Sequence, residues 1–344
     1  MAELPTAEAV REALGEALGD DPGELSLEHV PGGASRETWL VAGDGGRWVL
    51  RREPPGAESF VPLSVEVEVS GAAAEAKVPV PRVVAFEGEG GRFGSPGYLM
   101  EHVDGTSVAP RVLRRDELAG ARERIPVQLA TALARIHSLD PGKLPSVAPA
   151  GDDPALAACE FWERALDDVG EPLPAVEAGL RWLRLHPPPA PAQAALVHGD
   201  FRLGNFIVDA DGLAAVIDWE LCHAGDPAED IGWLCIRSWR FGNDELQVAG
   251  VGELEPFLAA YEAAGGTRPD MQQLRWWEAL GNVKWAVICA RQAHDHLTGA
   301  RPSLELASLG RRICEPEWDL LQLLSGSNPD GSGREAEQPA GGIP

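Results

Sequence analysis

Cysteine is scarce in this sequence, and no two cysteines form a C-x-x-C pair. The chain has five cysteines in 344 residues, spread from Cys159 to Cys314. An odd number of scattered cysteines argues against a disulfide framework and against a structural zinc site. The sequence therefore favours a reducing compartment, and we expect a cytoplasmic protein.

Basic residues are also few. The chain carries 29 lysines and arginines against 54 aspartates and glutamates, which gives a formal net charge of −25. Nucleic acids and anionic membranes attract basic surfaces, so this balance argues against both as the main partner. An acidic surface is more typical of a solubility feature than of a binding device.

Long apolar runs are missing. No segment approaches the ~20 consecutive apolar residues that a membrane-spanning helix needs. The first twenty residues have the pattern of an acidic amphipathic helix and not that of a signal peptide. Hydrophobic residues still make up 44% of the chain, which is enough for a full core in two domains or one two-lobed unit.

The first part of the chain is mostly strand-like. Its apolar residues alternate with polar ones, and the sequence GDGG between two such runs predicts a tight hairpin. We expect strands at 25–30, 36–42, 47–53, near 83 and at 97–105, with one main helix at 63–76. These elements predict an N-terminal lobe over residues 1–103, built on an antiparallel sheet.

Helices dominate after this lobe. Apolar residues at helical spacing predict helices at 126–140, 154–166, 175–186, 227–238, 253–264, 270–297 and 303–324. We therefore expect an α+β fold with a larger, mostly helical lobe over 104–324 and a ligand cleft between the lobes. The remaining residues, 325–344, are rich in glycine, proline, serine and charge, and predict a disordered tail.

One short stretch concentrates polar residues that can do chemistry. The sequence LVHGDFRLGNFIVDADGLAAVIDWE, residues 196–220, contains His198, Asp200, Asn205 and Asp218. If the hairpin turn is centred on the Asp-Gly pair at 211–212, Asn205 lies opposite Asp218, with Cβ atoms ~4.5–5.5 Å apart. Asp200 precedes the same end, so the hairpin brings together hard oxygen ligands of the kind that Mg²⁺ prefers.

The spacing Asp200-x-x-x-x-Asn205 is that of a kinase catalytic loop. Together with VIDWE, GDPAEDIGWL and the VPVPR segment, HGDFRLGN resembles the aminoglycoside phosphotransferase-like kinases. It is most similar to the branch that includes kinase domains attached to acyl-CoA dehydrogenases. The resemblance covers about residues 22–324 and implies a protein-kinase-like, two-lobed fold.

The resemblance also implies roles for the matching residues. Asp200 would be the catalytic base, with His198 shaping the catalytic loop, and Asn205 and Asp218 would hold Mg²⁺ against the phosphates of ATP or GTP. Asp226 and Asp230 would brace the loop by accepting hydrogen bonds from backbone N–H groups.

The N-terminal lobe should bind the nucleotide phosphates. Gly32, Gly33 and Ser35 join two predicted strands, and glycines there let backbone N–H groups approach phosphates. The resemblance implies a lysine on the third strand, but Arg51 stands at that position. An arginine can bind phosphate as a bidentate fork. Arg52 is a second candidate, and a solvated surface arginine is the structural alternative.

Two further nucleotide contacts follow from the resemblance. The helix of the lobe should supply an ion-pair partner for the arginine, and we assign Glu66, with Glu68 as a rival. The backbone from Met100 to His102 should form the hinge that binds the edge of the adenine. Met100 can alternatively be a plain core residue.

Other polar residues have simpler interpretations. His137 lies on an apolar helix face, where a hydrogen-bonded core histidine is much commoner than a ligand. Arg237, Arg240 and Arg291 are candidates for binding an anionic group of the substrate, although pairing with nearby acids is an equal alternative.

We therefore predict a small-molecule kinase that transfers phosphate from Mg·ATP to a hydroxyl group. The acceptor is a metabolite such as a hydroxyacyl-CoA, or an aminoglycoside-like antibiotic. The alternatives are a nucleotide-binding pseudokinase with a regulatory or scaffold role, and a metallophosphatase that uses His198, Asp200, Asp218 and His223. The sequence leaves the oligomeric state open.

Overall fold

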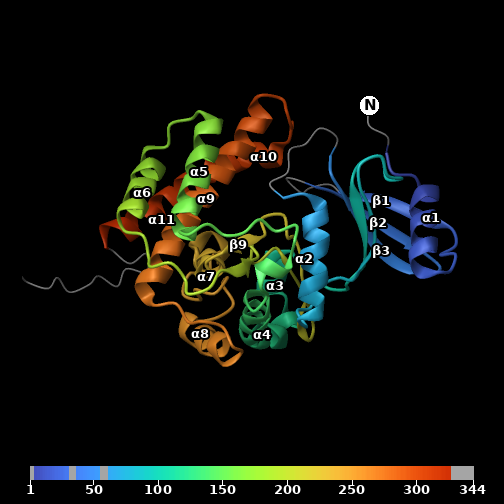
Figure 1. The fold of residues 1–344 in the computed structure, drawn as a ribbon, viewed down its shortest axis with the longest axis horizontal. Helices are drawn as coiled ribbons and strands as arrows, with labels where there is room; N and C mark the ends of the chain where they lie inside the picture. The colour runs from blue at the N-terminus through green and yellow to red at the C-terminus, as the bar shows by residue number, and fades with distance from the viewer. Residues whose placement is uncertain (1–3, 31–35, 55–60, 327–344) are drawn as a thin grey trace, which may run out of the picture.

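The N-terminal part of the protein is an antiparallel sheet (Figure 1). The computed structural model describes residues 4–30, 36–54 and 61–326. Five strands pair in the order β1-β2-β3-β5-β4. They are β1 (Leu25–Val30), β2 (Glu37–Gly43), β3 (Gly46–Arg52), β4 (Val83–Glu87) and β5 (Gly97–Glu101).

The predicted hairpin joins β2 and β3. Gly43 pairs with Gly46, so Asp44 and Gly45 form a two-residue turn. The register that this turn sets places Arg51 opposite Thr38 on β2 and Tyr98 on β5. Because side chains alternate along a strand, Arg51 and its neighbour Arg52 project to opposite faces of the sheet.

A helix packs against each face of the sheet (Figure 1). Helix α1 (Ala7–Leu18) starts at Thr6, whose hydroxyl accepts the Ala9 N–H, and buries Leu14 in a cluster with sheet residues such as Leu50. Helix α2 (Leu63–Glu75) lies between the sheet and the helical part of the chain, and its Val69 belongs to the main core cluster. This position gives α2 direct contact with both parts.

The larger part of the protein is mostly helical. Its α-helices are α3 (Ala109–Arg114), α4 (Ala119–His137), α5 (Pro154–Val169), α6 (Pro174–Leu185), α7 (Ala228–Cys235), α8 (Leu254–Ala263), α9 (Met271–Leu297), α10 (Leu304–Leu309) and α11 (Cys314–Ser325). Short 3₁₀ helices are η1 (Asp116–Leu118), η2 (Pro141–Lys143), η3 (Arg237–Trp239) and η4 (Gly310–Arg312). The strands are β6 (Ala195–Val197), β7 (Phe206–Asp209), β8 (Gly212–Val216) and β9 (His223–Gly225).

These elements confirm the expected fold class, which is α+β with a small sheet-based part and a larger helical part. The amphipathic helix predicted at the N-terminus is α1, and it packs on the sheet in addition to the one main helix expected there. The helix expected at 303–324 is instead broken into α10, η4 and α11. Helix α11 also runs through Ser325, so the last element extends one residue into the predicted tail. In the described part of the chain, no helix combines the length and the apolar character needed to cross a bilayer.

Candidate active site

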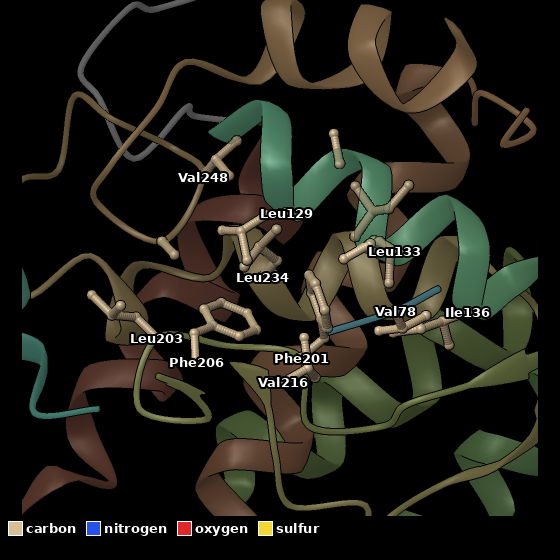
Figure 2. Close-up of a cluster of buried hydrophobic side chains, with 14 of the residues drawn as sticks. Val78, Leu129, Leu133, Ile136, Phe201, Leu203, Phe206, Val216, Leu234 and Val248 are labelled. Carbon is tan, nitrogen blue, oxygen red and sulfur yellow. The ribbon is translucent and has the colours of Figure 1, made fainter. Parts of the chain in front are cut away.

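The loop between β6 and β7, residues 198–205, is fixed by apolar side chains. Figure 2 shows Phe201, Leu203 and Phe206 inserted into the core beside Leu133 of α4 and Leu234 of α7. All five side chains are fully buried. The polar residues of the loop alternate with these anchors, so the same local sequence that buries the anchors holds the polar side chains in place.

The hairpin that follows has a different turn from the predicted one. Asp209 pairs with Gly212, so the turn is centred on residues 210–211. The Asp209 carboxylate accepts the Asp211 N–H at 2.7 Å, and Arg124 of α4 binds the carbonyls of both turn residues. This side-chain turn and the contacts from α4 outweigh the usual preference for Asp-Gly at the turn centre.

The different turn shifts the strand register. A bulge between Ile207 and Val208 moves the register again, and the Ile217 N–H then donates to the Asn205 carbonyl at 3.0 Å. Asn205 therefore faces Ile217, and the prediction that Asn205 lies directly opposite Asp218 was wrong by one residue. Asp218 follows immediately and has a left-handed backbone conformation, with φ of 72°.

Asp200 and Asn205 are joined directly. The Asn205 Nδ2 donates to Asp200 Oδ2 at 2.6 Å and to the Asp200 carbonyl at 3.0 Å. This orientation of the amide leaves Oδ1 as the Asn205 atom that can ligate a cation. Asp200 Oδ1 accepts two further hydrogen bonds, from Arg202 Nε at 2.9 Å and from Trp233 Nε1 at 2.8 Å. The carboxylate is thus held from three sides.

Asp218 connects this loop to the sheet. Its Oδ1 lies 2.8 Å from Nη2 of Arg51 on β3. Burial opposes the positive charge on Arg51, but Asp218 and the neighbouring Tyr98 and Glu66 outweigh it and raise the pKa of the guanidinium. Arg51 is buried, so the alternative of a solvated surface arginine was wrong.

Glu66 is buried on α2, but its direct ion-pair partner is Arg36 and not Arg51. Two nitrogens of Arg36 donate to Glu66 Oε1, at 2.6 and 3.1 Å, and the Tyr98 hydroxyl donates to Oε2 at 3.3 Å. Burial raises the pKa of Glu66 against the pull of Arg51 and Arg36. The rival Glu68 instead accepts the Ser146 N–H at 3.1 Å, outside this cluster.

Arg36 is a site residue that the sequence alone did not single out. It also binds Glu53 at 3.2 Å and the Val61 carbonyl at 2.7 Å, so it links β2, β3 and the start of α2. The only local signal was a cation directly after the glycine-containing segment 31–35. The other candidate, Arg52, projects to the opposite face and binds Glu37 at 2.6 Å.

Asp230 braces the loop of residues 198–205 through its backbone. Its two carboxylate oxygens accept the N–H groups of His198 at 2.7 Å and Gly199 at 2.9 Å. His137 also binds Asp230, at 3.0 Å, which makes it the hydrogen-bonded core histidine that the sequence predicts. Asp226 caps its own helix instead, by accepting the Ala228 N–H at 2.8 Å.

His198 is fully buried and shapes the loop. Its Nδ1 accepts the Asp200 N–H at 3.1 Å, and its ring packs 4.5 Å from that of Trp219. Burial lowers the pKa of His198 despite the nearby acids Asp230, Asp200 and Asp218, which favours the neutral imidazole over the charged one. The enclosed ring therefore helps to hold the backbone of Asp200 in place.

Gly199 has no room for a side chain. Its φ is +79°, and a Cβ there would lie 2.1 Å from the Leu221 carbonyl oxygen. The Gly199 carbonyl is contacted by Lys284 Nζ, and that nitrogen lies 3.6 Å from Glu229 and 4.5 Å from the ring centroid of Trp233. Lys284 is a second residue that the sequence did not single out, because it comes from α9, 85 residues away.

The nucleotide-binding predictions are placed only in part. Gly32, Gly33 and Ser35 lie outside the described residues. Met100 is half-buried on β5, and the His102 N–H donates to the Arg47 carbonyl at 3.1 Å. The His102 amide is therefore engaged within the sheet, and the role of the 100–102 backbone in binding adenine stays a prediction.

All three arginines proposed for an anionic substrate group are paired with acids, as the alternative expects. Arg240 is buried and binds the Cys235 and Asp244 carbonyls. Arg237 binds Asp319 at 2.8 Å. Arg291 is 43% exposed and lies 3.6 Å from Asp295, which leaves it the most accessible of the set.

A metallophosphatase centre does not form. Among the described residues, no group of three or more histidine, cysteine, aspartate or glutamate side chains is arranged to hold a metal. His223 binds the Leu221 carbonyl at 2.9 Å and Glu229 at 3.1 Å. The structure therefore does not support that alternative.

Comparison with known sequences gives one family over most of the chain. The family described as "Phosphotransferase enzyme family" matches residues 26–277. Acyl-CoA dehydrogenase family member 10 of Mus musculus is 28% identical over 315 residues, and member 11 of Gallus gallus is 28% identical over 331 residues. These matches cover 86% and 89% of this chain but 29% and 42% of the relatives, so the chain spans less than half the length of either.

Solved structures share the fold. A candidate aminoglycoside phosphotransferase from Ralstonia eutropha has a TM-score of 0.71 at 23% identity, over 92% of this chain and 98% of its own. A variant of aminoglycoside phosphotransferase APH(4)-Ia in complex with ADP and hygromycin B has a TM-score of 0.58 at 20% identity, over 90% and 98%. Macrolide 2′-phosphotransferase MphH from Brachybacterium faecium has a TM-score of 0.55 at 19% identity, over 90% of this chain and 98% of its own.

Proposed function

This chain belongs to the phosphotransferase enzyme family, and from that membership we propose that it transfers the γ-phosphoryl group of Mg·ATP to a hydroxyl group of a small molecule. One observation carries the proposal. Asp200 and Asn205 are in contact at 2.6 Å, Ile217 pairs with Asn205 so that Asp218 follows at the same end of the hairpin, and Asp218 reaches the sheet through Arg51 at 2.8 Å. The arrangement supports a reaction centre between the two parts of the chain.

The donor set fits a magnesium nucleotide. Asn205 Oδ1 and the Asp218 carboxylate are hard oxygens, and Mg²⁺ uses few protein ligands beside water and phosphate. Among the described residues, the buried Nε of Arg51 has no hydrogen-bond partner, which leaves a donor for phosphate. When bound, Mg·ATP supplies the phosphoryl group and neutralises much of its charge. Asn205 and Asp218 would hold the metal, and Arg51 would hold the phosphates.

Asp200 would act on the acceptor. Its carboxylate orients a hydroxyl group and takes the hydroxyl proton as the new bond to phosphorus forms. Phosphoryl transfer depends mainly on positioning and electrostatics, so a carboxylate fixed by three donors suits the task. Asp230 and His198 keep the loop in place and have no direct part in the reaction.

For the acceptor we favour a metabolite such as a hydroxyacyl-CoA. The sequence relatives are named acyl-CoA dehydrogenase family members, which supports an acyl-CoA-related substrate. Arg291 is accessible enough to meet an anionic group. A structural neighbour binds hygromycin B, so an aminoglycoside-like acceptor belongs in the same test.

The test is an ATP-consumption assay across acceptor classes. Purified protein with Mg·ATP is offered hydroxyacyl-CoAs, aminoglycosides, macrolides and simple amino-alcohols, and the phosphorylated product is identified by mass spectrometry. The proposal expects one class to be phosphorylated, with loss of turnover when Mg²⁺ is chelated. ATP binding without transfer to any class and without phosphate release would contradict it.

One observation favours the second candidate, a nucleotide-binding pseudokinase. The ion pair between Arg51 and Asp218 occupies Oδ1, one of the two carboxylate oxygens with which Asp218 would bind a metal. If this pair persists with nucleotide bound, the protein binds ATP without Mg²⁺ and does not turn over. Nucleotide affinity measured with and without Mg²⁺ separates the two functions, because the kinase requires the metal and the pseudokinase does not.

A further inference from the structure

Arg202 lies within the catalytic loop and binds the carboxylate expected to act as base. Its Nε donates to Asp200 Oδ1 at 2.9 Å, and its guanidinium lies 4.5 Å from the ring centroid of Trp239 on η3. The side chain is 25% exposed, so it borders the open side of the loop. Neither the motif nor the metal site requires an arginine at this position.

The two oxygens of Asp200 are not equivalent. Oδ1 accepts hydrogen bonds from Arg202 and from Trp233 Nε1, at 2.9 and 2.8 Å. A carboxylate oxygen has two lone pairs, so these donors saturate Oδ1. Among the described residues, Oδ2 accepts one hydrogen bond, from Asn205 at 2.6 Å. An incoming hydroxyl therefore meets a free lone pair only at Oδ2.

Gly204 and Trp239 lie beside the Arg202 guanidinium. Gly204 has φ of +121°, and a Cβ there would lie 2.4 Å from Arg202 Nη1. The guanidinium is bounded on another side by Trp239, whose ring packs 5.1 Å from that of Trp233. A glycine and two tryptophans thus surround the contact between Arg202 and Asp200, which fixes the rotation of the carboxylate.

We infer that Arg202 is a positioning residue that orients Asp200 so that Oδ2 alone receives the proton of the acceptor hydroxyl. The inference rests on the proposed function. The acceptor oxygen forms a bond to the γ-phosphorus while the bond from that phosphorus to the β–γ bridging oxygen breaks. The electron pair of the broken bond leaves with ADP, and the hydroxyl proton passes to Oδ2.

The experiment compares Arg202→Met and Arg202→Lys with wild type. The readouts are phosphoryl transfer to the best acceptor of the panel and phosphate release from Mg·ATP with water as acceptor. Each is measured as kcat and KM, together with Mg·ADP affinity and thermal unfolding. Arg202→Met should lower kcat about 10- to 100-fold, the range expected for losing one hydrogen bond to a charged group. The KM for ATP should stay within about twofold, since Arg202 binds the base and not the residues assigned to the nucleotide.

Two further variants sharpen the result. Arg202→Lys keeps the charge and should recover part of kcat, which a purely structural role does not predict. Trp233→Phe removes the other donor to Oδ1 and should lower kcat in the same way. Arg184→Met is the matched control, because it removes an arginine–carboxylate pair with Glu163 far from the loop, where both side chains are about 40% exposed.

The outcomes separate this inference from the proposed function. An active wild type with unchanged kcat in Arg202→Met overturns the inference alone. So does a kcat loss matched by lost Mg·ADP affinity in both Arg202 variants, since that indicates a collapsed loop. A wild type that binds Mg·ADP but releases no phosphate to any acceptor or to water overturns the proposed function and the inference with it.

Discussion

Arg51 and Asp218 are 167 positions apart, and their side chains form an ion pair at 2.8 Å that joins the sheet to the catalytic hairpin. The pair brings the cation that we propose to bind phosphate into contact with the carboxylate that we propose to bind Mg²⁺. A buried pair of this kind costs desolvation, so it is poor evidence for stability on its own. Its position between β3 and the hairpin places Arg51 beside the proposed Mg·ATP site, where Oδ2 of Asp218 is the oxygen that Arg51 leaves open.

Replacing Arg51 should weaken nucleotide binding. Arg51→Met removes the guanidinium that would bind phosphate, and we expect Mg·ATP affinity to fall about 10- to 100-fold, as for the loss of a charge-assisted hydrogen bond. Arg51→Lys should retain part of the affinity. Isothermal titration calorimetry measures both. Arg47→Met, which breaks an exposed pair with Asp104, is the control, and equal affinities in all three variants would argue against the assigned role.

Removing Arg36 should destabilise the protein strongly. Arg36→Met leaves Glu66 buried without its direct partner, and the loss of one member of a buried ion pair costs ~3–5 kcal/mol. Arg36→Met/Glu66→Leu removes both charges and should regain part of this loss. Urea unfolding of Arg36→Met, Glu66→Leu and the double variant gives the coupling free energy between Arg36 and Glu66. Additive losses would show that Arg36 and Glu66 do not act as a pair.

Gly199→Ala should disrupt the catalytic loop more than a positive φ alone explains. The Cβ would overlap the Leu221 carbonyl oxygen at 2.1 Å in a left-handed conformation. Gly299 has nearly the same φ, +78°, and a Cβ added there would meet no atom within 4 Å, so Gly299→Ala measures the backbone strain of ~1–3 kcal/mol alone. In thermal unfolding, the melting temperature of Gly199→Ala should lie well below that of Gly299→Ala. Equal melting temperatures would contradict the close approach.

His223 should give the folded state a dependence on pH. Burial opposes its charge, but Glu229 outweighs burial and raises the pKa of His223 above the ordinary 6.5. The raised pKa stabilises the folded state fully below pH 6.5, and this contribution is lost as pH rises through the folded value. His223→Gln should therefore flatten the decline in unfolding free energy above pH 6.5, measured by urea titration at several pH values. If the unfolding free energy of His223→Gln falls with pH as steeply as that of wild type, His223 does not contribute this pH dependence.

The fold was largely predictable because its elements have strong local signals. The alternating residues of β1 to β3, the GDGG turn and the apolar period of α9 each identify an element without tertiary information. The break between α10 and α11 was not predictable, since the helical period continues across η4. All three elements pack against α9, and a Cβ at Gly310, the first residue of η4, would lie 2.9 Å from Ala293 on that helix.

The site was predictable where its residues are close in sequence. The spacing of Asp200 and Asn205 indicated their contact, which the structure gives at 2.6 Å. The partners of Glu66 and the donor Trp233 were not predictable, because each contact joins segments about 30 residues apart or more. The hairpin register failed for a similar reason, since Arg124 on α4 helps to choose the turn.

The most direct test of the proposed chemistry is phosphoryl transfer by Asp200→Asn, compared with wild type at saturating Mg·ATP. The substitution keeps the size of the side chain but removes the base, and loss of a general base typically costs about 10²- to 10⁴-fold in rate. We predict that product formation falls by at least this much while Mg·ADP binds with wild-type affinity. Retained turnover in Asp200→Asn would contradict the central claim that this loop carries out the transfer.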